Sequence, residues 1–239
     1  MEQEEQNQEE IGNKNMIAIT HPIKQMINSQ YGFLSSMMDR FPSLLSEWIK
    51  KQEEEVEQLA GEYAEGDYEV YRDTYNSEIS RVDPCYDEEL LFNQSMLIMV
   101  YSYYESILCR LAKECGVKEE RPGAIAAKYK ATIEGEYLKI VTFLHNTLLP
   151  LRNQLCHNNN GTLYARSKKE DIENINKLIQ KKYISIDDER IYITNREFVK
   201  QVLDGEHKLL LKLAGICGFK TTIYGYEDGV GSMTPLRSW

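Results

Sequence analysis

Residues 87–115 read DEELLFNQSMLIMVYSYYESILCRLAKEC, which is the most apolar helical segment of the 239-residue chain. Apolar side chains recur along it at three- and four-residue spacings, and further apolar residues widen this stripe to most of the circumference. A helix that is apolar on most sides is typical of the centre of a helical core. The segment therefore predicts an all-α fold in which the other helices pack around this one.

Apolar stripes with helical spacing also mark the segments on either side. The sequence predicts helices over residues 23–41, 45–66, 68–79, 136–149, 167–182 and 194–217, with a short helical insert within 117–135. Pro42 is expected to break or kink the first stretch, and Pro150 to begin a new short turn. Thr194 and Glu197 match a capping box that would start the last helix.

Residues 183–193 alternate with period two around a polar turn, which predicts one small β-hairpin. The expected fold is thus an antiparallel helical bundle with one hairpin. We expect residues 1–15 to form a disordered acidic tail and residues 16–82 an N-terminal helical extension. The main helical domain would span residues 83–217, and residues 218–239, with four glycines and one proline, would form an irregular tail.

The composition predicts a cytoplasmic protein that does not enter a membrane. The longest apolar run, Met96 to Tyr101, is far shorter than a bilayer span, and the first ten residues are acidic where a signal peptide would be basic and then apolar. The five cysteines are scattered without a CxxC motif, so a disulfide framework is not indicated. Cys109 and Cys115 are expected to pack as small hydrophobic residues in a reducing compartment.

Charge is distributed unevenly along the chain, whose net charge is −10. Residues 1–109 carry 22 acidic and 7 basic residues, whereas residues 110–182 carry 8 acidic and 14 basic ones, a net charge of +6. A polyanion would therefore be met by the middle of the chain, where Lys168 and Lys169 are candidate contacts. The simpler interpretation is that these lysines only solvate a helix face.

Common catalytic signatures are absent from the sequence: it contains no P-loop, no dinucleotide-binding glycine pattern, no HExxH and no GxSxG. His21, His145 and His207 have no second ligand at the spacing of a metal site. No metal and no cofactor are therefore predicted.

One polar segment stands apart, RNQLCHNN at residues 152–159. Asn153 and His157 are four residues apart and share a helix face, whereas Leu148, Leu151 and Leu155 share the opposite one. Arg152 can reach around the helix to join the polar pair. Such a face could hold a phosphate, with the guanidinium on its oxygens and the imidazole near a hydroxyl.

The segment resembles the HEPN superfamily, whose signature is an Arg, four to six residues and then a His, usually with a polar residue directly after the Arg. Arg152, Asn153 and His157 match that pattern, and the resemblance covers roughly residues 87–215. It implies a HEPN-like helical bundle and a metal-independent endoribonuclease, such as a toxin or a phage-defence effector. The chain departs from toxins that have nucleotidyltransferase antitoxins, because Asn159 stands where those toxins carry a tyrosine.

The resemblance also implies how the residues would work. His157 would be the general base or acid, Arg152 would stabilise charge on the transition state, and Asn153 would orient His157 or the phosphate. Glu105 in the central helix and Asn158 are accessory candidates, with Arg152 a possible partner for Glu105. A single His cannot easily serve as acid and base together, so a homodimer with a composite site is implied, together with an RNA substrate and an antitoxin or regulatory partner.

Two other interpretations remain open. The chain could be a non-catalytic HEPN-like module that binds protein or RNA, in which Arg152 pairs with an acid and His157 caps the end of its helix. A metal hydrolase is the more distant alternative.

Overall fold

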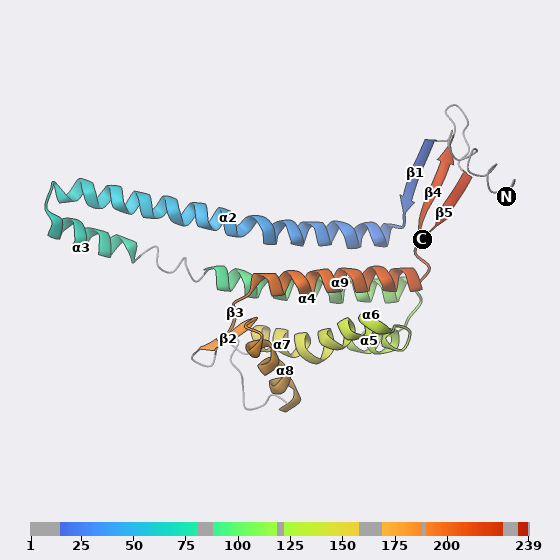
Figure 1. The fold of residues 1–239 in the computed structure, drawn as a ribbon. Coiled ribbons are helices and arrows are strands. Elements are labelled where there is room, and N and C mark those ends of the chain that lie inside the picture. The colour runs from blue at the N-terminus through green and yellow to red at the C-terminus, as the bar shows by residue number, and fades with distance from the viewer. Residues whose placement is uncertain are drawn as a thin grey trace.

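The computed structural model of the chain describes residues 15–80, 88–118, 122–157, 169–187, 190–226 and 234–238. This part is mostly helical, as the sequence predicts (Figure 1). Helices α4 (Glu88–Glu114) and α9 (Arg196–Ile216) run side by side through the middle of the bundle. Helix α2 (Pro22–Ala64) covers one side of this pair, and α5 (Pro122–Lys130), α6 (Gly135–Phe143) and α7 (Leu149–His157) cover the other.

Helix α4 occupies the centre that its sequence predicts. Its inward residues are almost completely inaccessible to solvent, among them Leu97, Val100, Tyr104, Leu108 and Leu111. Leu91 and Met99 remain exposed, so the apolar stripe is wider than the buried face. The core is continuous from α2 through α4 and α9 to α7, as expected when one helix is covered on several sides.

Helix α2 does not end at Pro42 but continues as one helix of 43 residues, so of the two expected effects, a break or a kink, the break does not occur. Proline removes one backbone hydrogen bond from a helix interior, at a cost of about 3 kcal/mol. Packing of α2 against α4 and α9 before the proline, and against α3 after it, offsets this cost. Before it, Ile27 and Met38 are buried in the bundle, and Phe41 stacks on Phe92 of α4 with ring centroids 4.1 Å apart.

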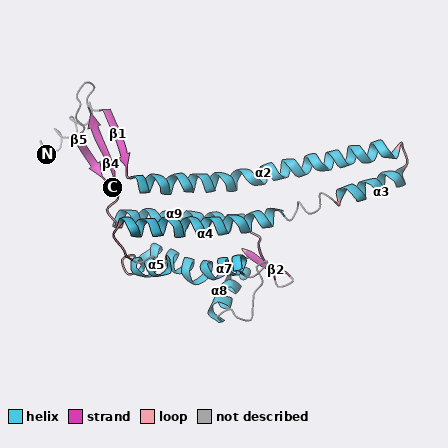
Figure 2. Ribbon diagram, turned by 180° about the vertical axis from the view of Figure 1, so that it is seen from behind, coloured by secondary structure: helices cyan, strands magenta, loops and turns pink. Residues whose placement is uncertain are grey.

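Beyond Pro42 the chain forms a helical hairpin that projects past the end of the bundle, as Figure 2 shows. We call residues 43–80 the arm. It comprises the second half of α2, a turn with positive φ at Glu65 and Gly66, and α3 (Tyr68–Ile79). The first half of α2 contributes to the core of the bundle, so within the predicted extension at residues 16–82 it is the arm that projects beyond the bundle.

The chain from α6 to α7 also continues without the expected new start at Pro150. A π-helical turn, η2 (Leu144–Leu148), joins the two helices, and the Leu149 amide donates to the Leu144 carbonyl. Pro150 cannot donate to the carbonyl four residues earlier, that of Asn146. The side chain of Asn174 on α8 (Lys169–Gln180) donates to that carbonyl instead, at 2.9 Å, so a tertiary contact supplies the missing partner.

The predicted β-hairpin is confirmed as β2 (Ile184–Asp187) and β3 (Arg190–Ile193), which pair antiparallel. The start of α9 differs by one residue from the predicted capping box. Asn195 is the N-cap, and its side chain accepts a hydrogen bond from the Phe198 amide at 2.9 Å. The hydroxyl of Thr194 donates instead to the Lys182 carbonyl.

A three-stranded antiparallel sheet lies at the end of the bundle opposite the arm, where the sequence predicts only tails. Strand β1 (Asn15–Thr20) pairs with β4 (Thr221–Tyr226), which also pairs with β5 (Thr234–Ser238). The expectation of an irregular tail at 218–239 is therefore wrong for both strands. Pro235 is tolerated because β5 is an edge strand. Residues 1–14, predicted to be disordered, lie outside the described residues.

A disulfide between Cys115 and Cys217 joins the C-terminal ends of α4 and α9, with their Cα atoms 6.1 Å apart. Cys115 is thus not the simple packing residue that the sequence predicts. The two cysteines are 102 residues apart, and no spacing pattern in the sequence predicts that they pair. Within the described residues, no helix is long and apolar enough to cross a membrane.

Candidate functional site around Arg152

The polar segment predicted from the sequence lies on α7, against the central helix α4. Leu148, Leu151 and Leu155 are buried and anchor this stretch to the core. Asn153 lies on the opposite side of the helix and is half-buried, and Arg152, about 100° away from it around the axis, is half-buried as well. The apolar face is therefore confirmed for these three leucines, whereas the side chain of His157, which would share the polar face with Asn153, lies outside the described residues.

The guanidinium of Arg152 is held from two sides. Its Nη1 donates to Oδ1 of Asn153 at 3.1 Å, and its Nη2 lies 3.8 Å from Oε2 of Glu105. The Glu105 contact is an ion pair but is too long for a hydrogen bond. Nε of Arg152 is buried and has no hydrogen-bond partner among the described residues. The Nη edge therefore retains unused donors that a bound anion could accept.

Glu105 reaches this site because of its register on α4. It follows Tyr104, which is completely buried, and precedes exposed Ser106, so it sits at the border of the buried face. The Glu105 and Arg152 side chains are 25% and 23% exposed. The structure thus brings together Arg152, Asn153 and Glu105, the three candidates whose side chains it describes around the motif.

A second carboxyl group, Glu206 on α9, completes the cluster and was missed by the sequence analysis. It is 0% exposed, and neither of its carboxyl oxygens has a hydrogen-bond partner in the part of the chain that the structure describes. Burial, and then the charge of Glu105, raise the pKa of Glu206 well above its ordinary value. A signal exists in the sequence, because Glu206 falls at helical spacing between Val202 and Leu210 on the apolar stripe of α9.

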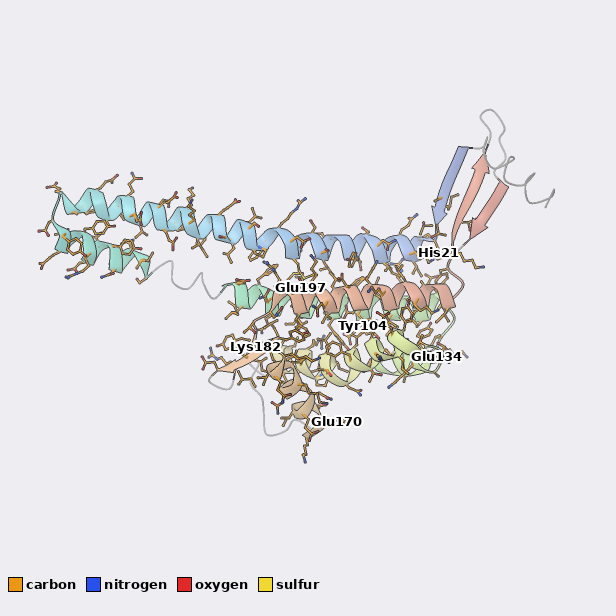
Figure 3. The ribbon with its side chains drawn as sticks, viewed as in Figure 1. His21, Tyr104, Glu134, Glu170, Lys182 and Glu197 are labelled. Atoms are coloured by element: carbon orange, nitrogen blue, oxygen red, sulfur yellow. A yellow bond between two sulfur atoms is a disulfide. The ribbon has the colours of Figure 1, made fainter. Side chains whose placement is uncertain are left out.

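Buried tyrosines separate the polar groups. Burial, and then the charges of Glu105 and Glu206, raise the pKa of Tyr101. Tyr104, labelled in Figure 3, lies between α4 and the layer of α6 and α7, and its hydroxyl is 3.3 Å from Nε2 of His145. Burial lowers the pKa of His145, so this imidazole is held neutral near neutral pH. These buried side chains therefore give the inner side of the Arg152 guanidinium a surrounding of low dielectric constant.

Other predicted site residues are not brought to Arg152 by the described structure. His157 is the last residue of α7, but its side chain lies outside the described part. Asn158 and Lys168 also lie outside the described residues. Lys169 is exposed at the start of α8, and its ion-pair partner among the described residues is Glu173 of the same helix, at 4.0 Å.

The remaining histidines have local roles. His21 caps α2 by accepting a hydrogen bond from the Ile23 amide and stacks on Phe219. His207 stacks on Tyr31, with ring centroids 4.0 Å apart. Among the described residues, no group of three or more His, Cys, Asp or Glu side chains is arranged to hold a metal ion.

Comparison with known proteins adds no assignment to this geometry. No protein-family model, no curated protein and no solved structure matches the chain.

Proposed function

We propose that the chain is a metal-independent endoribonuclease of the HEPN type, which acts as a homodimer and serves as a toxin or phage-defence effector. The observation that carries this proposal is the Arg152 guanidinium, fixed by Asn153 and Glu105 while its Nη edge stays partly open. His157 ends the same helix five residues later. The motif, its place at a helix end and the helical surroundings all agree with the HEPN resemblance.

The chemistry follows from the residue types. The 2′-hydroxyl of RNA would attack the adjacent phosphodiester, the 5′-oxygen would leave with a proton, and a 2′,3′-cyclic phosphate would remain. His157 suits the proton transfers because the ordinary pKa of histidine is about 6.5. Arg152 would stabilise the charge that develops on the phosphorane oxygens.

The geometry refines the role of Asn153. Its side-chain oxygen accepts from Arg152, so we assign Asn153 to orienting the guanidinium rather than the histidine. Glu105 would hold the opposite side of the same group and is a positioning residue. A second copy of the chain would supply the second histidine, since one imidazole cannot donate and accept a proton in the same step.

The direct test is cleavage of single-stranded RNA by the purified chain in EDTA, with analysis of the product ends. We expect cyclic-phosphate or 3′-phosphate ends, and light scattering should give twice 27.8 kDa. Arg152→Ala should lower the cleavage rate by about 10²–10³-fold, the range typical of removing one transition-state donor. His157→Ala should abolish cleavage with a nearly unchanged melting temperature.

Matched variants control for general damage. Arg196→Ala removes an exposed arginine at the start of α9, and His21→Gln removes a histidine that lies outside the Arg152 cluster. Both should cleave at the wild-type rate. Strict dependence on a divalent metal, or equal losses in the control variants, would contradict the proposed mechanism. A stable monomer that cleaves RNA would contradict the composite site alone.

The alternative function is a non-catalytic helical module that binds protein or RNA. It is favoured by the Glu105–Arg152 pair, which gives Arg152 a structural partner, and by exposed apolar residues on the arm such as Leu44 and Tyr68. Expression in cells separates the two functions. Growth arrest that Arg152→Ala relieves supports the nuclease, whereas harmless expression of the wild-type chain supports the module.

A further inference from the structure

A half-open pocket lies between α6, the end of α8 and α9, and it shares no lining residue with the Arg152 cluster. Its volume is about 290 Å³, close to the lower end of the range typical of ligand sites, roughly 300 Å³. Its inner surface is apolar and includes the buried side chains of Leu178, Phe198 and Val202. A small apolar group placed there would lose contact with water on most sides.

The charges around this pocket have a single sign. Lys139 on α6 and Lys181 after α8 are the only charged side chains among the described residues that line it. Both are exposed, and neither forms an ion pair with any residue that the structure describes. Lys181 lies instead over the ring of Tyr183, 5.9 Å from its centroid. In a chain with net charge −10, this local pair of unused cations favours an anion.

The glycine at position 205 helps to keep the pocket open, because it places no side chain in it. It lies in the middle of the 21-residue helix α9, where glycine is less favourable than alanine, and it lines the pocket. A Cβ added there would meet only Ile140, at an ordinary contact distance of 3.7 Å, so the backbone does not require a glycine. A larger side chain would instead extend into the pocket.

We propose that this pocket binds a small amphipathic anion, with the apolar body between α6, α8 and α9 and the anionic head between Lys139 and Lys181. The shared chemistry is one apolar or aromatic group that carries one carboxylate, phosphate or sulfonate. A mononucleotide and a medium-chain fatty acid both satisfy it. This inference is independent of the proposed nuclease activity, because it uses none of the residues around Arg152.

The test uses 8-anilinonaphthalene-1-sulfonate, an aromatic anion whose fluorescence rises on apolar binding, and its uncharged analogue N-phenyl-1-naphthylamine. The full chain should bind the sulfonate saturably at one site. Gly205→Leu, which fills the pocket, should weaken the binding of both probes by about tenfold or more. Gly215→Leu is the matched control, because Gly215 lies exposed on the same helix with open space around it, and it should bind like the wild type.

The role of the two lysines is tested by comparing the affinity of lysine variants for the charged probe with their affinity for the uncharged one. The double variant Lys139→Ala/Lys181→Ala should bind the sulfonate about tenfold more weakly than the wild type. Its affinity for the uncharged probe should be unchanged. The control pair Lys113→Ala with Lys208→Ala, both exposed elsewhere in the bundle, should change neither. Displacement of the sulfonate by AMP or by decanoate then identifies which of the two sources fits.

Three outcomes would overturn the proposal. These are the lack of saturable binding by the folded wild type, equal binding by Gly205→Leu and Gly215→Leu, and loss of binding in Leu44→Ser on the arm rather than in the pocket variants. If Gly205→Leu fails to give the wild-type circular dichroism spectrum, the lysine pair with its two probes decides alone.

Discussion

The bundle and the arm depart from ordinary burial in opposite directions. In the bundle, polar groups are shut away from water: Glu206 is fully buried, and neither its carboxyl oxygens nor the buried Nε of Arg152 has a hydrogen-bond partner among the described residues. In the arm, apolar groups face water: Tyr68 is 74% exposed and Leu44 is 61% exposed. The arm also carries 11 acidic and 3 basic residues, a net charge of −8.

This difference separates two kinds of unusual residue. A buried, unpartnered carboxyl group lowers stability and marks a place where chemistry rather than packing explains the residue. An exposed apolar residue on a projecting hairpin costs little stability, because the same residue is exposed to water in the unfolded chain as well. Stability should therefore depend on the bundle, and the arm should behave as a separate unit that extends from it. Three predictions test this contrast.

The largest effect is expected from truncating matched leucines in the two regions. Leu108→Ala removes a fully buried side chain from α4 and should lower the free energy of unfolding by about 2–5 kcal/mol. Leu44→Ala in the arm should change it by less than about 0.5 kcal/mol. Urea denaturation followed by circular dichroism measures both. Comparable losses would show that the arm and the bundle unfold as one cooperative unit.

The next largest effect is expected on the pH dependence of stability, through the buried carboxyl group of Glu206. Because its pKa is raised in the folded state, the folded chain holds this proton more tightly than the unfolded chain. The protonated Glu206 therefore contributes fully to the free energy of unfolding below its unfolded pKa, about 4.3. This contribution is lost as the pH rises toward the pKa of Glu206 in the folded state. Glu206→Gln should increase stability at neutral pH, by at most about 1.4 kcal/mol for each pH unit in that interval.

Thermal melts of Glu206→Gln and wild type between pH 4 and pH 8 measure this difference. The two melting temperatures should converge at the acid end and separate as the pH rises. Glu57→Gln, an exposed site on the arm, should follow the wild type throughout. If Glu206→Gln is less stable than the wild type at pH 7, the carboxylate has a partner that stabilises it in its charged form.

The smallest effect is expected from removing the N-cap residues of two helices, one in the bundle and one in the arm. Asn195 caps α9 in the bundle, and Asp67 caps α3 in the arm by accepting from the Glu69 amide at 2.9 Å. Replacing either by Ala removes a cap worth about 1 kcal/mol. Asn195→Ala should lower global stability by that amount, whereas Asp67→Ala should only speed hydrogen exchange within residues 68–79. Faster exchange across α4 in Asp67→Ala would contradict the independence of the arm.

Local patterns were sufficient for most helices and for the hairpin. Residues 68–79 and 88–114 are helical within one or two residues of the prediction, because their periodicity depends only on near neighbours. The division of α7 into an apolar and a polar face was predictable for the same reason. The proximity of Glu105 to Arg152 was one possibility among two, since an exposed position for Glu105 fitted the sequence equally well.

Tertiary contacts decided the rest. Helix α2 continues through Pro42 because it packs against α4 before the proline and against α3 after it. The chain near the turn at 144–148 gains a hydrogen bond from Asn174 of another helix. The sheet pairs Asn15–Thr20 with Thr221–Tyr226, and Cys115 joins Cys217, across separations at which no sequence spacing is informative.

The amino-acid sequence by itself thus determined which segments are helical and which of their faces are apolar, because these depend on interactions within a few residues. Only the tertiary structure decided that Glu206 has no hydrogen-bond partner among the described residues, that the Arg152 guanidinium lies between Asn153 and Glu105, and that a pocket opens beside Gly205. Those features depend on distances between side chains from different helices. Such distances are set by how the helices pack against one another.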